Sequence, residues 1–173
     1  MSGTTPPVAV LSDIHAFSQA LDDVLRAARE AGAREWWCLG DLVGYGADPT
    51  HCLHTCTAGA ARCLAGNHDL GAAERIPIGS FSDIAGVALE WTRTTLGPVG
   101  RNRLNRLSPA DADADVPLFH ASPRDPVWEY VTTVAQARDA LEARRVRLTM
   151  VGHTHVAVGW HLRPDGAMEE IRG

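Results

Sequence analysis

The sequence predicts an α/β fold built on a parallel β-sheet. Three short apolar runs, at residues 7–11, 35–40 and 62–66, have the composition of buried strands. A segment with helical character separates each run from the next. Because parallel strands need a crossover connection, this β-α-β-α-β order predicts a parallel sheet with helices on both faces.

The first connection shows a clear apolar helix face. Its apolar residues recur at helical spacing, and Gly32 follows them as a helix-ending residue. The face consists of Phe17, Leu21, Val24, Leu25 and Ala28. The second connection begins with a glycine-rich loop at 41–49, and Pro49 fits the first position of a helix.

The middle of the chain predicts further helices. Ser82 is a candidate N-cap for a helix over 82–97, and the segment 99–109 is compatible with another helix. An acidic loop then leads into a short strand at 117–119.

The last part of the chain predicts one helix and a terminal hairpin. Thr133 and Gln136 fit a capping box that opens a helix reaching about residue 144. An apolar strand run at 148–160 follows and is interrupted in its middle. Strands at 156–162 and 167–171 flank a turn at 163–166. Since no repeat and no long linker is present, residues 1–173 are expected to form a single domain.

Composition excludes several classes of protein. The formal net charge is −5, and apolar residues make up 45% of the chain. An acidic balance argues against tight binding to duplex nucleic acid or to an anionic membrane surface. No window approaches the ~20 apolar residues of a membrane span, and the N-terminus lacks the features of a signal peptide. A cytoplasmic protein is therefore expected.

Four cysteines raise the question of a zinc or redox sensor. Cys38, Cys52, Cys56 and Cys63 should remain thiols in a protein without a secretion signal. Cys52 and Cys56 lie on one helix face, which keeps a zinc site open as an alternative. The chain has no C-x-x-C pair, so burial of the cysteines as small apolar residues is favoured.

Residues that can bind metal follow five of the predicted strands. They are Asp13 and His15, Asp41, Asn67, His120, and the pair His153 and His155. A single polar residue of this kind is usually a cap or a turn residue. Five such strand ends in chain order indicate a site, because ligands bind at the carboxyl ends of strands in open α/β sheets.

The ligand types indicate two metal ions. Carboxylate, imidazole and amide oxygen together suit divalent ions such as Mn²⁺, Fe²⁺, Zn²⁺ and Ni²⁺. Seven ligands are too many for one catalytic ion with an open position. They suit two ions about 3.5–4 Å apart that share one bridging carboxylate.

These residues resemble the sequence pattern of the calcineurin-like metallophosphoesterase superfamily. That pattern is D-x-H, G-D-x-x, G-N-H-D/E, a lone H, and G-H-x-H, and all five blocks occur here in order. The resemblance extends from Val8 to about Val158. The chain is similar in detail to a bacterial branch of small single-domain members. The resemblance implies a four-layer αββα sandwich.

The resemblance also implies two ligand sets that share Asp41. The ligands of the first metal would be Asp13, His15, Asp41 and His155. The ligands of the second would be Asp41, Asn67, His120 and His153. In this scheme the two histidines of the last block serve different ions, and Gly152 supplies the bend between strand and loop.

The implied activity is phosphoester hydrolysis by a two-metal mechanism. A hydroxide that bridges the metals would attack phosphorus in line, with Mn²⁺ expected first and Fe, Zn, Ni or Mg as alternatives. His68 would face the scissile phosphate and assist the leaving group, and Asp69 would orient or charge His68.

Three segments depart from the family pattern. Ala16-Phe17 stands where the branch often has Gly-Asn, and His120-Ala121 stands where it often has His-Gly. Few residues follow His155, so the second sheet is expected to be short. Its edge would be open or covered by another subunit, which would make the protein a homo-oligomer.

The sequence leaves the substrate open among small phosphate esters. Arg124, Trp128 and Tyr130 are candidates for a substrate wall near His120, with Arg124 as the candidate substrate-binding residue, or they fix their loop by packing. Phosphomonoesters, phosphodiesters, nucleotides and phosphoproteins are all substrates within the superfamily. The alternatives to an enzyme are a non-catalytic metal-binding scaffold with the same fold and a cysteine-based sensor.

Overall fold

Three parallel strands form the sheet that the sequence predicts. The computed structural model describes residues 6–144 and 147–172. β1 (Val8–Leu11), β2 (Glu35–Cys38) and β3 (Arg62–Cys63) lie side by side in chain order, and each neighbouring pair is parallel. β2 is shorter than expected because the backbone turns out of the sheet at Gly40, where φ is 103°. β3 is likewise reduced to two residues.

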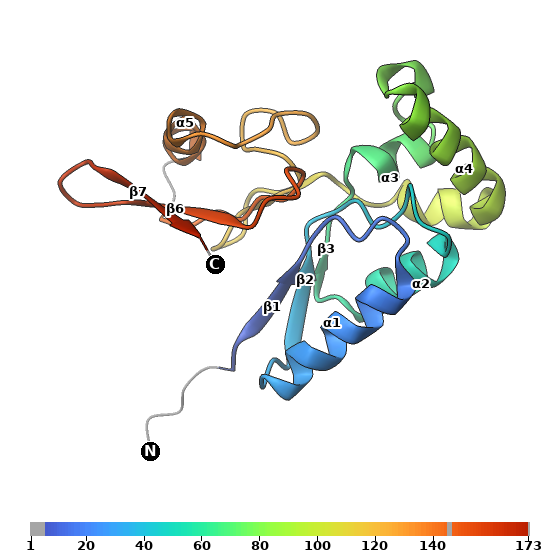
Figure 1. The fold of residues 1–173 in the computed structure, drawn as a ribbon, viewed down its shortest axis with the longest axis horizontal. Coiled ribbons are helices and arrows are strands. Elements are labelled where there is room, and N and C mark those ends of the chain that lie inside the picture. The colour runs from blue at the N-terminus through green and yellow to red at the C-terminus, as the bar shows by residue number, and fades with distance from the viewer. Residues whose placement is uncertain (1–5, 145–146, 173) are drawn as a thin grey trace.

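The two connecting helices cover one face of this sheet, not both faces as the sequence suggested (Figure 1). α1 (Ser18–Glu30) and α2 (Pro49–Gly59) share one apolar cluster with the strands. Within it Leu25 of α1 and Cys56 of α2 are buried together with Cys38 of β2. Because the strands follow chain order, right-handed crossovers in one direction bring both helices to the same face.

The predicted ends of these helices are confirmed. Gly32 follows α1 with φ of 91°, as a left-handed residue at a helix end does. Pro49 occupies the first turn of α2. The preceding Asp48 is the N-cap, and its carboxylate accepts a hydrogen bond from His51 N at 3.1 Å.

The middle of the chain contains one unexpected helix and one long one. α3 (Asn67–Ala72) follows β3 directly, where the sequence analysis predicted no helix. After the short 3₁₀ helix η1 (Ile78–Ser80), α4 (Asp83–Leu104) joins the two expected helices. Ser82 Oγ accepts a hydrogen bond from Ala85 N at 3.4 Å, which confirms the N-cap. Gly97, with φ of 58°, and Pro98 kink α4 at the predicted boundary.

Two short strands begin the second layer. β4 (Ala110–Asp111) pairs antiparallel with β5 (Leu118–Phe119), so the expected acidic loop contains a strand. The strand expected near residue 148 is reduced to one parallel bridge between Leu118 and Met150. Leu118 forms a second apolar cluster with Leu39, and Met150 packs against that cluster. This cluster joins the second layer to the end of β2.

A helix and a hairpin complete the second layer. Thr133 and Gln136 form the predicted capping box before α5 (Val134–Arg144). α5 contacts the antiparallel strands β6 (Val158–Leu162) and β7 (Met168–Arg172), whose turn is closed by a hydrogen bond from Gly166 N to Arg163 O. The sheets are small and form a shortened version of the expected sandwich. Of the helices that the structure describes, none combines the length and apolarity needed to cross a bilayer.

Candidate metal centre

The seven expected metal ligands come from loops that follow five strand segments. Asp13 and His15 follow β1, Asp41 follows β2, and Asn67 begins α3. The other three, His120, His153 and His155, follow β5 and the bridge at Met150. His15 N donates a hydrogen bond to Asp41 O at 2.9 Å, and Gly152 N donates one to His120 O at 2.8 Å. Backbone hydrogen bonds therefore join neighbouring loops in pairs.

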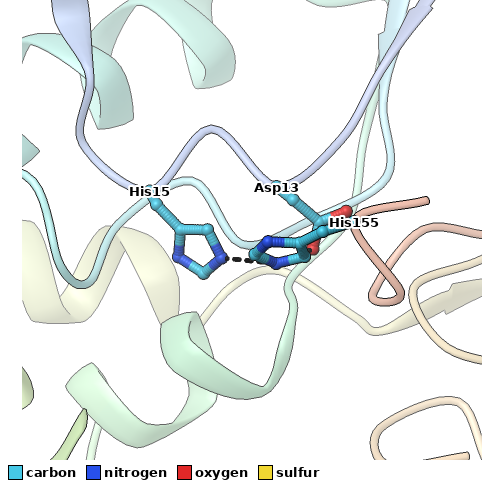
Figure 2. A group of neighbouring side chains, drawn as sticks. All are labelled: Asp13, His15 and His155. Carbon is cyan, nitrogen blue, oxygen red and sulfur yellow. Dashed lines mark hydrogen bonds and ion pairs between the residues drawn. The ribbon is translucent and has the colours of Figure 1, made fainter. Parts of the chain in front are cut away.

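Asp13, His15 and His155 form the first group of ligands (Figure 2). Each offers a ligand atom, and these atoms lie within 4.8 Å of one another. His155 Nε2 lies 3.1 Å from His15 Nε2 and 3.4 Å from Asp13 Oδ1. Asp13 Oδ1 is buried and accepts no hydrogen bond. This convergence of uncompensated donor atoms fits a metal cation.

Asp41, His120 and His153 form the second group. His120 Nε2 lies 3.2 Å from His153 Nδ1 and 3.1 Å from Asn67 Oδ1. His153 Nε2 is buried without a hydrogen-bond partner. The structure thus brings Asn67 to the same group, as the sequence analysis expected.

Asp41 lies between the two groups. Its Oδ2 is 3.6 Å from His15 Nε2 and 3.6 Å from His120 Nε2. Its Oδ1 accepts a hydrogen bond from His68 N at 2.9 Å, which fixes the carboxylate. The residue is 1% exposed, so little solvent is available to stabilise its charge.

Backbone carbonyls set the tautomers of two central histidines. His15 Nδ1 lies 3.3 Å from Val43 O, and His120 Nδ1 lies 3.0 Å from Leu39 O. A carbonyl oxygen only accepts hydrogen bonds, so each Nδ1 carries the proton. Each Nε2 is then unprotonated and has a lone pair for a metal ion, as a metal-binding imidazole does.

Burial shapes the ionisation of the same groups. Burial, and then the charge of His68, lower the pKa of His15 to about 3. Burial, with His153 nearby, lowers the pKa of His120 to about 3. Burial and then the charges of Asp69 and Asp13 raise the pKa of Asp41 well above its ordinary value. Neutral imidazoles beside crowded carboxylates fit divalent cations, which would offset the negative charge.

Left-handed backbone conformations are concentrated in these loops. Among the residues that the structure describes, eight non-glycine residues have positive φ, and five of them are expected ligands. They are Asp13, His15, Asp41, His153 and His155. Such conformations are unfavourable for residues with a Cβ and gather at functional sites. Unfavourable backbone conformations are therefore concentrated at the residues whose side chains form the ligand groups.

Two glycines allow the loops to approach one another. A Cβ at Gly66 would overlap the Asp41 carboxylate, and a Cβ at Gly152 would overlap the Ser12 side chain. Gly152 was expected to supply the bend after its strand. The left-handed bend lies instead at His153 and His155, with φ of 68° and 56°, and Gly152 is needed for close packing.

His68 and Asp69 are both buried, but they do not form the expected pair. Asp69 accepts hydrogen bonds from the backbone N of Leu42, Val43 and Gly66 at 2.9–3.1 Å. His68 Nδ1 has no hydrogen-bond partner. Asp69 therefore holds the loop after β2 against the start of α3, and it does not orient His68 by direct contact. His68 also forms a metal-compatible group with His15 and Asp41.

Arg124 is engaged in its own loop. Its guanidinium pairs with Glu129, and its Nη1 lies 2.7 Å from Asp139 Oδ2. These contacts agree with the alternative that this loop is fixed by packing. A substrate role for Arg124 stays a prediction.

A cavity of about 310 Å³ opens onto the metal groups. It is lined by Asp41, Tyr45, Asn67, His68, Tyr130, His153, Thr154 and His155. Tyr130 was a candidate for the substrate wall, whereas Tyr45 was not identified from the sequence. The signal for Tyr45 was its position between two glycines in the loop after Asp41.

The cysteines lie apart from these groups. Cys52 and Cys56 have no exposed surface and belong to the core between α2 and the sheet. Within residues 6–144 and 147–172, no metal-compatible cluster includes a cysteine. Packing is therefore the role that the structure supports for them.

The sequence matches one protein family over most of its length. The calcineurin-like phosphoesterase family matches residues 6–157. An uncharacterised protein of Methanocaldococcus jannaschii is 31% identical over 160 residues. That match covers 86% of this chain and 62% of the relative, so the chain spans less than two thirds of the relative's length.

Solved structures share the fold. A metallophosphoesterase from Sphaerobacter thermophilus has a TM-score of 0.76 and 33% identity, over 90% of this chain and 63% of that protein. A hypothetical protein from Pyrococcus horikoshii has a TM-score of 0.68 and 17% identity, over 95% of this chain and 86% of that protein. At that identity, the second similarity shows the fold alone.

Proposed function

This chain belongs to the calcineurin-like phosphoesterase family, and from that premise we propose that it hydrolyses phosphate monoesters or diesters with two divalent metal ions. The observation that carries the proposal is the position of Asp41 between two groups of ligands, 3.6 Å from a histidine Nε2 on each side. A carboxylate in that position suits a bridge between two ions.

The two ligand sets follow from this bridge. We propose that one ion is held by Asp13, His15, Asp41 and His155. The other is held by Asp41, Asn67, His120 and His153. Mn²⁺ is proposed first, because it accepts carboxylate, imidazole and amide oxygen together, with Fe, Zn, Ni or Mg as alternatives.

When bound, such a pair of ions supplies an activated water and neutralises charge on the phosphoryl oxygens. The chain's own residues prepare the site for this chemistry. The backbone carbonyls of Val43 and Leu39 hold the protons of His15 and His120 away from the metals. Asp69 supports the arrangement by tying together the loops that carry Asp41 and Asn67.

His68 is proposed to assist the leaving group. It lines the cavity, and its Nδ1 has no hydrogen-bond partner. Burial, and then the charges of His120 and His153, lower the pKa of His68 to about 4, so its ring is neutral at pH 7. An anionic ester beside the ring would raise this pKa. The ring could then take up a proton from solvent, and the resulting imidazolium could pass that proton to the leaving oxygen as the P–O bond breaks.

The test is hydrolysis that depends on metal. Protein loaded with Mn²⁺ should hydrolyse p-nitrophenyl phosphate or bis(p-nitrophenyl) phosphate, lose the activity on treatment with a chelator, and regain it when Mn²⁺ is restored. Two bound ions with no turnover of any phosphate ester would favour the non-catalytic scaffold.

A further inference from the structure

Two tyrosines stand at the opening of the metal cavity, and neither belongs to the proposed ligand sets. Tyr45 comes from the loop between β2 and α2, and Tyr130 comes from the segment before α5. Both line the 310 Å³ cavity, and they are 48% and 54% exposed. Exposed aromatic rings at a polar site contribute little to the core, so another role is indicated.

Tyr130 is held by one histidine. Its ring stacks on the ring of His153, with centroids 4.2 Å apart and an interplanar angle of 25°. Stacking covers one side of the tyrosine ring, and the remaining exposed surface is available to a second flat group. The contact with His153 fixes this ring beside one proposed metal position.

Tyr45 is held by two other histidines of the site. Its ring centroid lies 4.9 Å from that of His15 and 4.6 Å from that of His68. Its backbone has φ of 21°, between two glycines pressed against the site. A Cβ at Gly44 would lie 2.6 Å from His68 Nδ1, and one at Gly46 would overlap the His15 carbonyl. The loop is thus packed tightly where it presents Tyr45, in a conformation that tyrosine rarely adopts.

The cavity offers few other contacts to an ester substituent. Among the described residues that line it, none is lysine or arginine. Thr154 Oγ1 is already used locally, accepting a hydrogen bond from Val156 N at 3.2 Å. A substituent that extends from the phosphate therefore meets aromatic surface and no cationic side chain.

We infer that Tyr45 and Tyr130 determine substrate specificity by stacking against a flat aromatic ring in the ester substituent, such as an aryl group or a nucleobase. The inference rests on the proposed phosphoesterase function and names its substrate class. Aromatic rings stack favourably on flat groups, whereas a saturated ring of equal size gains only apolar contact. The cavity volume lies at the lower end for ligand pockets, which favours a small ester.

The test compares two phosphonates that cannot be hydrolysed. Phenylphosphonate and cyclohexylphosphonate carry the same charged group and the same number of ring atoms, and they differ in the flatness of the ring. Calorimetry on the Mn²⁺-loaded chain should show about tenfold tighter binding of phenylphosphonate, as expected for one stacked ring. A second pair, AMP and ribose 5-phosphate as competing ligands, shows whether the preferred ring is also a nucleobase.

Variants assign the preference to the two rings. Tyr130→Leu and Tyr45→Leu should reduce the phenyl-to-cyclohexyl ratio to about twofold or less, since the stacking surface is removed. Tyr130→Phe keeps the ring and should keep the ratio. Trp91→Leu is the matched control, because Trp91 is 46% exposed on α4 and does not line the cavity.

The outcomes separate this inference from the proposed function. Equal binding of the two phosphonates by a chain that hydrolyses esters would overturn the inference alone. A preference unchanged in both leucine variants would also overturn it. Binding of neither phosphonate, together with no turnover of any ester, would overturn the proposed function and this inference with it.

Discussion

At the scale of one residue, a substitution at His68 separates an effect on catalysis from an effect on metal binding. His68 lies beside Asn67 in α3, but it is surplus to the proposed ligand sets. His68→Asn should therefore retain both ions and the thermal midpoint. Turnover of bis(p-nitrophenyl) phosphate should fall by ~10² or more, the usual effect of losing a placed proton donor. The deficit should be larger for an alkyl ester, whose leaving group needs more protonation.

The control for this variant is His54→Asn. His54 is an exposed histidine whose Nδ1 lies 3.2 Å from Arg103 Nη1, away from the cavity. It should change neither metal content nor rate. Unchanged rates in His68→Asn on both esters would end the catalytic role of His68. Loss of an ion in that variant would make His68 a ligand, as its grouping with His15 and Asp41 allows.

Gly66 tests the close approach of the loops. A methyl group at Gly66→Ala would overlap the Asp41 carboxylate and move it away from both ligand groups. We expect loss of bound metal, and a decrease of about 1–3 kcal/mol in the free energy of unfolding from overpacking. Gly79→Ala is the control, because a Cβ there meets nothing within 4 Å. Full metal content in Gly66→Ala would contradict this prediction, because it would mean that the metal groups form without the close approach of Gly66 to Asp41.

At this scale the sequence predicted which residues gather but not how they are supported. The positions of Asp13, Asp41 and Asn67 at strand ends were sufficient to expect a shared site. The hydrogen bonds of Asp69 to backbone groups 26 and 27 residues away in the chain depend on tertiary packing. Tyr45 was missed for the same reason, because the residues next to it in the sequence do not reveal its contacts with the site histidines.

At the scale of elements, the two cysteines of α2 test whether this helix serves packing or metal binding. Changing Cys52 and Cys56 together to Ala should leave metal content and turnover near those of the wild type. The free energy of unfolding should fall by about 1 kcal/mol for each buried sulfur removed. Elemental analysis and thermal denaturation measure the two effects. Loss of stoichiometric zinc in the double variant would revive the sensor interpretation.

The thiol of Cys52 gives a prediction for pH. Burial, and then the charges of Asp48 and Asp22, raise the pKa of Cys52 from 9.0 to about 12. The folded state thus favours the neutral thiol. The resulting stabilisation is present below pH 9 and is lost as pH rises toward 12. Alkylation of Cys52 at pH 8 should be slow in folded protein and fast after unfolding. Equal labelling rates would contradict this account.

Most helices and strands were predictable from the sequence, whereas β4 and α3 were not. The apolar periodicity of α1 and the capping residues Asp48 and Ser82 are local signals, although Asp48 was recognised only in the structure. β4 consists of Ala110 and Asp111, and unlike the two-residue strands β3 and β5 it lies in no apolar run. α3 has six residues directly after a strand, and its N-terminal hydrogen bond from Gly66 N to Asp69 Oδ2 was hidden within the metal-binding motif.

At the scale of the whole molecule, the metal centre joins two parts of the fold. Asp13, His15 and Asp41 follow strands of the parallel sheet, whereas His120 and His153 follow the strand segments of the second layer. The strand order also explains why α1 and α2 share a face, which the sequence could not predict because it does not fix that order. Self-association through the edge of the second sheet stays a prediction.

The most direct test of the account is the metal content of Asp41→Ala. The central claim is that two ions share this carboxylate. Wild-type protein loaded with Mn²⁺ and desalted should carry two ions per chain by elemental analysis, and Asp41→Ala should lose both. Asp22→Ala is the matched control, because Asp22 is an exposed aspartate that also pairs with a histidine, His51. It should keep two ions. A full pair of ions in Asp41→Ala would contradict the account.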